Sequence, residues 1–232
     1  MESDNGRGAA GGELRHRHAL LTSRLRAVAA ANGHDPDRLR IVGVTKTHPV
    51  ALVRAAFEAG ITRLGENRVQ EAEPKIAAVP DAEWHFIGRL QSNKVRRVVR
   101  AFAMIHSVDS GDLLERLDAV ASEEHRAPLV LLQVNVSGEA TKAGFPPEAL
   151  ATVTTPGAVR LAGLMTMAPM DATPDEARAV FGGLRVLRDR LEDRLGLSLP
   201  ELSMGMSADA DAAAAEGATL VRIGTALFGP RA

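Results

Sequence analysis

Residues 41–50 read IVGVTKTHPV, an apolar run that is followed by a single lysine, Lys46. The run is short and rich in β-branched residues, which predicts a buried β-strand. Similar runs return along the chain, at 41–45, 62–64, 84–87, 104–108, 129–134, 159–165, 200–203 and 219–223. Helical patterns lie between them, at 50–59, 67–78, 92–101, 111–124, 146–153, 174–194 and 208–216, with a last short helix from Thr225 toward Pro230.

This alternation predicts an α/β protein whose parallel strands close into a single (β/α)8 TIM-type barrel. The length of 232 residues suits one such domain. An open doubly wound sheet is the competing architecture, but no G-x-G-x-x-G motif follows the first strand. Apolar residues at helical spacing over 13–31 predict an extra N-terminal helix, and the glycine-rich residues 1–12 predict a disordered tail. The barrel domain is therefore expected over 13–232.

The composition excludes several classes of function. The chain has no cysteine, which excludes disulfides, thiol nucleophiles and thiolate metal sites. The seven histidines form no H-E-x-x-H motif, so we expect no metal. A net charge of -1 and a single Trp argue against nucleic acid as a partner, and the basic segment 94–100 fits a solvated helix face. We find no secretory or membrane-spanning run, so a soluble, cytoplasmic protein without a membrane partner is expected.

Lysine is rare in this chain. Of the 28 lysines and arginines only four are lysine, namely Lys46, Lys75, Lys94 and Lys142. Because arginine serves as the usual cation, a retained lysine favours a site that needs an amine able to lose its proton. Lys75 and Lys94 also fit plain surface residues. Lys46 follows the first strand, at the barrel face where the loops of such enzymes carry the chemistry.

Two further loops reach the same predicted face. Ser207 precedes the helix after the seventh strand, and Gly224 and Thr225 open the last helix. Hydroxyl and N–H groups at helix starts suit a phosphate dianion, although helix capping by Ser207 is the alternative. A partly buried amine is more readily neutral and nucleophilic. The combination with Lys46 predicts a phosphorylated aldehyde as ligand, either pyridoxal 5′-phosphate or a phosphorylated sugar in an aldolase.

Arg222, within the last strand, favours the first of these ligands. It stands two positions before Gly224, so its side chain and the phosphate loop can reach opposite ends of one ligand. An arginine facing the pyridine nitrogen cannot accept a proton, so the ring would stay neutral. An arginine bonded to carboxylates inside the barrel is the alternative.

Seven segments, in order, resemble one protein family: VTKTHP, GENRVQEAEPK, WHFIGRLQSNK, HSVDS, LQVNVSGEATKAGF, GLMTMAP and LSMGMSADADAAAAEGATLVRIGTALFG. They are similar to the pyridoxal phosphate homeostasis proteins, which are single-domain relatives of the alanine racemase barrel. The resemblance runs from about Leu39 to the C-terminus. It implies a fold type III pyridoxal phosphate barrel without the racemases' C-terminal β domain. It also implies a role in vitamin B6 and amino-acid homeostasis without established turnover, so no catalytic residue is expected.

The resemblance implies which residues hold pyridoxal phosphate. The cofactor would be bound covalently to the strand-one lysine, its pyridine nitrogen would face the arginine, and its phosphate would lie on the last two loops. The implied set is Lys46 as the Schiff base, Asn67, His85, Ser207, Arg222, Gly224 and Thr225. Many relatives carry a second lysine two positions after the first, where this chain has His48.

Three classes of function stay open from the residues alone. They are a cofactor-binding carrier or regulator, a pyridoxal phosphate racemase or decarboxylase, and a Schiff-base aldolase without cofactor. Racemisation needs a base opposite the lysine, and the racemase relatives use a tyrosine, which this chain lacks. His85 or Lys142 is the candidate substitute. We expect a monomer, with pyridoxal phosphate-dependent apo-enzymes as candidate recipients of the cofactor.

Overall fold

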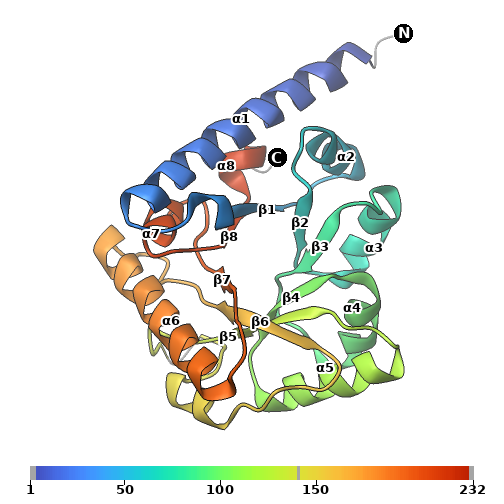
Figure 1. Ribbon diagram of the computed structural model, residues 1–232. Coiled ribbons are helices and arrows are strands. Elements are labelled where there is room, and N and C mark those ends of the chain that lie inside the picture. Colours follow the sequence, from blue (N-terminus) through green and yellow to red (C-terminus); the bar gives the residue numbers. More distant parts are fainter. Residues whose placement is uncertain (1–3, 140–141, 230–232) are drawn as a thin grey trace.

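The computed structural model describes residues 4–139 and 142–229. Eight parallel strands form a closed barrel in chain order, and β1 pairs with β8 to complete it (Figure 1). The TIM-type barrel predicted from the sequence is confirmed. The strands are β1 (Arg40–Val44), β2 (Arg63–Glu66), β3 (Glu83–Phe86), β4 (Met104–Val108), β5 (Leu129–Gln133), β6 (Arg160–Met165), β7 (Glu201–Ser203) and β8 (Leu220–Ile223).

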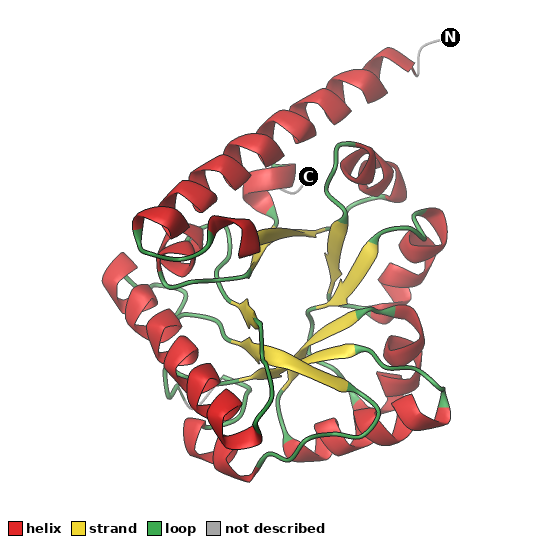
Figure 2. Cartoon of the chain, in the orientation of Figure 1, coloured by secondary structure: helices red, strands yellow, loops and turns green. Residues whose placement is uncertain are grey.

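Helices surround the barrel and cover the outer face of the strands (Figure 2). The α-helices are α1 (Asp4–Ala31), α2 (Val50–Glu58), α3 (Val69–Ala78), α4 (Val95–Ala101), α5 (Gly111–Glu123), α6 (Pro174–Leu195), α7 (Ala210–Ala215) and α8 (Thr225–Phe228). Short 3-10 helices occur at η1 (Pro36–Arg38), η2 (Ser92–Lys94) and η3 (Pro147–Thr152). The segment expected to be helical at 146–153 is therefore a 3-10 helix, whose prolines fit the first turn of a helix.

The N-terminal helix differs from the expectation at its start. Apolar spacing predicts a helix from residue 13, whereas α1 begins at Asp4, inside the stretch expected to be a disordered tail. A helix that is nucleated by packing extends at little further cost per residue, although the glycines of this stretch oppose helix formation. Residues 1–3 of the predicted tail lie outside the described residues. Leu25 and Ala29 are buried, and α1 packs across α2, α7 and α8.

Side-chain caps mark the ends of two helices that cover the barrel. Ser110 accepts a hydrogen bond from the N–H of Leu113 at the start of α5. Thr173 and Glu176 form a capping box at the start of α6, and Gly196 ends that helix in the left-handed region, at φ 63°. These local signals explain why the bounds of α5 and α6 agree closely with the helices expected at 111–124 and 174–194.

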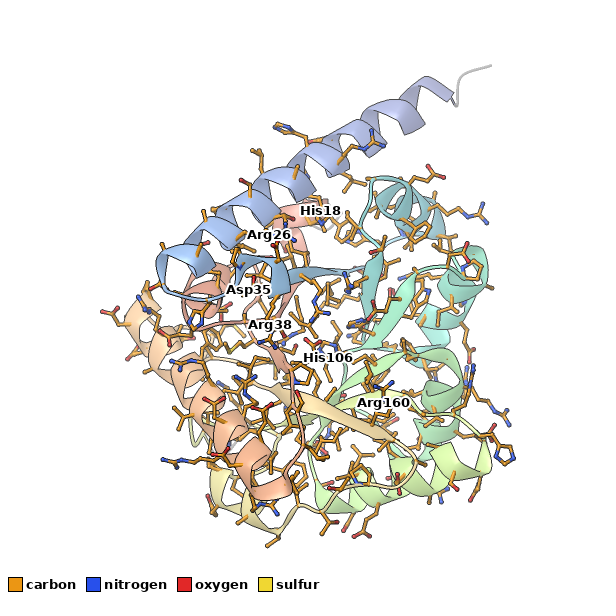
Figure 3. All side chains as sticks on the ribbon, viewed as in Figure 1. His18, Arg26, Asp35, Arg38, His106 and Arg160 are labelled. Carbon is orange, nitrogen blue, oxygen red and sulfur yellow. The ribbon has the colours of Figure 1, made fainter. Side chains whose placement is uncertain are left out.

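The inside of the barrel has an apolar and a polar half. The apolar part is a small cluster separate from the main core, made of Val42, Met104, Leu131, Ala162, Met165 and Leu220. The polar part contains four fully or almost fully buried residues, His85, His106, Ser203 and Arg222. Figure 3 shows His106 inside the ring of strands. Buried polar groups need partners, so this part of the barrel calls for a hydrogen-bond network.

Candidate functional site

Lys46 lies in the turn after β1 and is half-buried. It lines a small pocket together with Val44, His48, Gly224, Thr225 and Gly229. The pocket forms because β1 and β8 are neighbours in the closed barrel, which brings the ends of the first and last strands together. The structure therefore joins three of the residues implied for the cofactor, Lys46, Gly224 and Thr225.

Ser207 joins the same region from the seventh strand. Its hydroxyl accepts a hydrogen bond from the N–H of Ala226, at 3.3 Å, in the first turn of α8. Ser207 does not cap its own helix, because α7 begins after Asp209, whose carboxylate accepts from the N–H of Met206 at 2.6 Å. The simple capping alternative at α7 is therefore not what the structure has. This bond joins the loop after β7 to the start of α8, where Thr225 lines the Lys46 pocket.

Arg222 is 4% exposed and its guanidinium has two partners. One terminal nitrogen donates to the hydroxyl of Ser203 at 2.6 Å, and the other donates to the carbonyl of Thr166 at 3.1 Å. Neither partner is a carboxylate, so the alternative of an arginine bonded to barrel carboxylates is wrong. Burial lowers the pKa of Arg222 to about 10, an effect that Asp209 partly opposes. The guanidinium is therefore charged at neutral pH.

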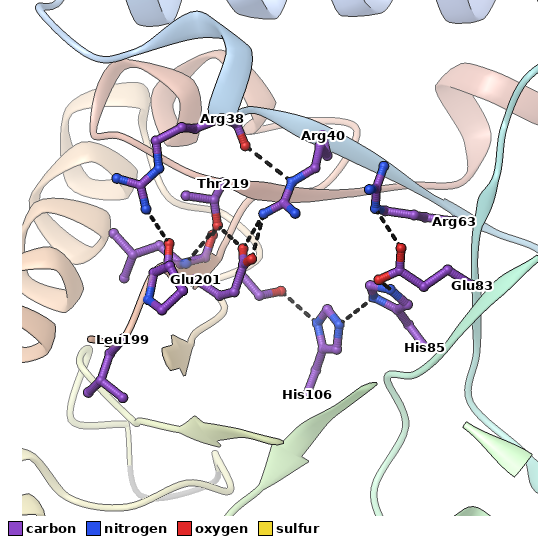
Figure 4. A network of polar contacts seen from close by, with 12 residues as sticks. Arg38, Arg40, Arg63, Glu83, His85, His106, Leu199, Glu201 and Thr219 are labelled. Carbon is purple, nitrogen blue, oxygen red and sulfur yellow. Dashed lines mark hydrogen bonds and ion pairs between the residues drawn. The ribbon is translucent and has the colours of Figure 1, made fainter. Parts of the chain in front are cut away.

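A chain of hydrogen bonds connects Arg222 with the opposite end of the barrel, and Figure 4 shows its part from His106 through His85 to Glu83. The hydroxyl of Ser203 lies 2.8 Å from Nδ1 of His106, and Nε2 of His106 lies 2.8 Å from Nδ1 of His85. Nε2 of His85 lies 3.0 Å from the carboxylate of Glu83 at the start of β3. We call these residues, from Arg222 to Glu83, the barrel relay.

One placement of the protons satisfies both ends of the relay and every bond within it. Arg222 can only donate, so Ser203 accepts from it and donates its own proton to Nδ1 of His106. His106 then carries its proton on Nε2 and donates it to His85, which donates in turn to the ionised Glu83. Both rings are neutral in this arrangement. An extra proton on His106 would sit on Nδ1, where it would meet the proton of the Ser203 hydroxyl or force that hydroxyl to turn away from its acceptor.

The electrostatics of the relay agree with a neutral His106 ring. Burial lowers the pKa of His106 well below 6.5, and the neighbouring His85 and Arg222 lower it further. At the other end, the hydrogen bond from His85 lowers the pKa of Glu83, which outweighs the opposing effect of burial, and Arg63 contributes in the same direction at 3.0 Å. The carboxylate end of the relay therefore stays ionised.

Two residues implied for the cofactor do not line the Lys46 pocket. His85 has both ring nitrogens occupied within the barrel relay, which links it to Arg222 through His106 and Ser203. Asn67 lines a separate cleft of about 690 Å3 between the loops that follow β2 and β3. Gly88 packs against Asn67 so closely that a Cβ there would lie 2.2 Å from the Asn67 carbonyl oxygen.

Sequence reasoning missed several buried polar groups. The interpretation of Lys75 as a surface residue is wrong, because Lys75 is 3% exposed and pairs with Glu66 and Glu71. The rarity of lysine in this chain was a signal that could have identified it. Ser203 had no such signal, because the positions that pair with it on the neighbouring strands are the apolar Met165 and Leu220.

The basic segment 94–100 is a paired helix face. Arg96 and Arg100 bind Glu124, and Arg97 binds Glu73. Within residues 4–139 and 142–229, no group of three or more histidine or carboxylate side chains could hold a metal ion. No helix in the described part of the chain is both long enough and apolar enough to cross a membrane.

Comparisons with known proteins agree with this architecture. The family model described as "Alanine racemase, N-terminal domain" matches residues 21–232. A pyridoxal phosphate homeostasis protein of Pseudomonas aeruginosa is 46% identical over 224 residues, which cover 92% of this chain and 94% of the relative. One from Synechocystis is 44% identical over 204 residues, 84% of this chain and 93% of the relative. The chain belongs to the pyridoxal phosphate homeostasis protein family.

Solved structures extend this family assignment. PipY of Synechococcus elongatus, determined with pyridoxal phosphate bound, is 41% identical with a TM-score of 0.78, covering 90% of this chain and 100% of PipY. Its form without the cofactor is 43% identical with a TM-score of 0.79, covering 88% and 98%. An alanine racemase of Clostridium difficile shares the fold at 14% identity, with a TM-score of 0.76 over 95% of this chain and 60% of the racemase.

Proposed function

We propose that this chain binds pyridoxal 5′-phosphate at the C-terminal mouth of its barrel and acts in intracellular pyridoxal phosphate and amino-acid homeostasis. The observation that carries the proposal is the pocket shared by Lys46, Gly224 and Thr225, beside the bond between Ser207 and Ala226. It combines an amine with the N–H and hydroxyl donors that a phosphate dianion requires. PipY, a relative at 41% identity, has been solved with this cofactor bound.

The residues present fit this cofactor. Pyridoxal phosphate supplies an aldehyde that condenses with an amine and a ring that delocalises charge. Lys46 is the amine that forms the covalent bond, and Ser207, Gly224 and Thr225 hold the phosphate. Arg222 would face the pyridine nitrogen and keep it unprotonated, since a guanidinium held by Ser203 and Thr166 can only donate. Asn67 remains a predicted neighbour of the cofactor.

Covalent attachment is tested by mapping the modified lysine. Purified protein is loaded with pyridoxal phosphate, reduced with borohydride, digested and analysed by mass spectrometry. We expect the label on Lys46. A label mainly on Lys75, Lys94 or Lys142 would contradict the assignment.

The phosphate site is tested with the double variant Ser207→Ala and Thr225→Val. Each lost hydrogen bond to the charged phosphate should cost about 1.5–3 kcal/mol, so affinity for pyridoxal phosphate should fall at least roughly tenfold. Affinity for pyridoxal, which lacks the phosphate, should change little. An equal loss for both ligands would assign these residues to loop structure alone.

We further propose that the cofactor is held without enzymatic turnover, in a cytoplasmic and monomeric protein that supplies or buffers it for apo-enzymes. The buried hydrogen bonds of His85 leave it no free ring nitrogen to act as a base opposite Lys46. The test is incubation with L-amino acids in deuterated water. Incorporation of α-deuterium at an enzymatic rate, abolished by Lys46→Ala, would overturn this part of the proposal.

A further inference from the structure

Lys75, on α3, directs its ammonium toward the turn that carries Lys46. Its Nζ lies 2.8 Å from the carbonyl oxygen of Thr45, 2.7 Å from Oε1 of Glu66 and 2.8 Å from Oε1 of Glu71. An ammonium has three protons, so these three acceptors satisfy it completely. The side chain of Lys75 is 4% exposed, which removes it from competition by water.

Both residues that flank Lys46 are held by this cluster. Thr45 is bound through its carbonyl oxygen by Lys75, and its hydroxyl donates to Glu66 at 2.6 Å. Thr47 donates its backbone N–H to the carboxylate of Glu71. The backbone is therefore fixed immediately before and immediately after the residue that bears the amine.

The conformation of the turn needs such support. Thr47 has φ 69°, in the left-handed region that a β-branched residue rarely adopts. The backbone N–H of this same residue donates to Glu71. The hydrogen bond and the strained backbone therefore depend on each other, and loss of the cluster would release the turn.

Burial acts against the ionised state of the two carboxyl groups in this cluster. Burial raises the pKa of Glu66 more than Lys75 and Thr45 lower it. Burial also acts to raise the pKa of Glu71, but the hydrogen bonds from Lys75 and from Thr47 outweigh it, and the net shift is downward. A purely apolar contact would hold α3 against β1 and β2 without desolvating these groups. What the polar cluster adds is a fixed geometry for the backbone around Lys46.

We propose that Lys75, Glu66 and Glu71 are positioning residues that clamp the turn 45–47 and so aim the Lys46 amine at the aldehyde carbon of pyridoxal phosphate. This inference rests on the proposed function. The three residues do not touch the cofactor; they act through the backbone on either side of Lys46. Covalent bond formation depends steeply on the placement of the reacting atoms, so a released turn should slow and weaken attachment.

The test compares two ligands that differ only at the reacting carbon. Pyridoxal phosphate can bond with Lys46, whereas pyridoxine 5′-phosphate carries an alcohol there and can only bind non-covalently. For Lys75→Met we expect affinity for pyridoxal phosphate to fall at least roughly tenfold, with slower growth of the visible absorbance of the lysine-bound cofactor. Affinity for pyridoxine 5′-phosphate should stay within about twofold, since the clamp does not contact the ligand.

Two further variants keep the test decisive. Lys94→Met removes a half-exposed lysine from the end of η2, and it should leave both affinities unchanged. Glu71→Ala removes a partly exposed carboxylate, which releases Thr47 and leaves Lys75 two of its three acceptors. It covers the case in which Lys75→Met does not fold. We expect for it the same selective loss for pyridoxal phosphate.

The outcomes separate the clamp from a purely structural role. Equal loss of both ligands in a folded Glu71→Ala or Lys75→Met protein, or no loss of either, would overturn the clamp while wild-type protein still labels at Lys46. Failure of the wild-type protein to label at Lys46 would instead overturn the proposed function, and the clamp with it. Selective loss for pyridoxal phosphate supports the clamp.

Discussion

The neutral state of His106 makes the stability of this protein depend on pH. Its folded pKa lies well below 6.5 because the ring is buried beside His85 and Arg222. As the pH falls below 6.5, the unfolded chain takes up a proton that the native protein refuses. The free energy of unfolding therefore falls as the pH falls, with a limiting slope of about 1.4 kcal/mol per pH unit for one proton.

The size of the effect follows from the distance between the pH and the unfolded pKa. At pH 5 the pH is about 1.5 units below the unfolded value, and a ring that stays neutral in the native state costs about 2 kcal/mol. Most carboxylates titrate below this range. His18 also has a pKa lowered by burial and contributes in the same direction, so the wild-type slope alone does not isolate His106.

The variant His106→Gln isolates the contribution of His106 to this pH dependence. A glutamine can accept from Ser203 and donate to His85, but it does not titrate. The free energy of unfolding of wild type and variant is measured with urea at several pH values from 7 to 5. Between pH 7 and pH 5 the variant should lose about 2 kcal/mol less stability than the wild type. His16→Gln, on an exposed part of α1, should keep the wild-type dependence. Parallel curves for wild type and His106→Gln would refute a relay with neutral rings.

Two further substitutions test the inside of the barrel. Ser203→Ala leaves the Arg222 guanidinium without one of its two partners, so the free energy of unfolding should fall by about 2–4 kcal/mol. Ser122→Ala, at an exposed position, should change it by less than about 0.5 kcal/mol. Urea unfolding measures both variants, and equal values would contradict the relay. Gly163→Ala puts a Cβ 1.9 Å from the carbonyl oxygen of Glu201 on the neighbouring strand. The midpoint of thermal unfolding should therefore fall by several degrees, and an unchanged midpoint would contradict the close packing of β6 and β7.

The sequence identified the elements of this fold because their signals are local. Apolar β-branched runs separated by helical patterns give all eight strands within a residue or two, and the cap at Thr173 and the glycine at 196 mark both ends of α6. Barrel closure follows from the same alternation, since eight parallel strands with helical crossovers have few other arrangements. The motif at 41–47 also indicated Lys46, because a lone amine after an apolar strand is unusual in a chain that prefers arginine.

The partners of the polar residues depended on tertiary structure. Lys75 looked like a surface lysine on α3, and only the packing of that helix against β1 and β2 carries it to the carbonyl of Thr45. His85 belonged to a motif implied for the cofactor, yet the closed barrel turns it toward His106, which lies 21 positions away in the sequence.

Ser207 shows the same limit at the mouth of the barrel. Its place before a helix predicted either a cap or a phosphate ligand, but gave no sign that the hydroxyl would accept from the N–H of Ala226, 19 positions along the chain. Local sequence determines which segments are strands and helices, because propensity and periodicity act over neighbouring residues. Which buried donor meets which acceptor is decided by strand register and barrel closure, which bring together groups from distant parts of the chain.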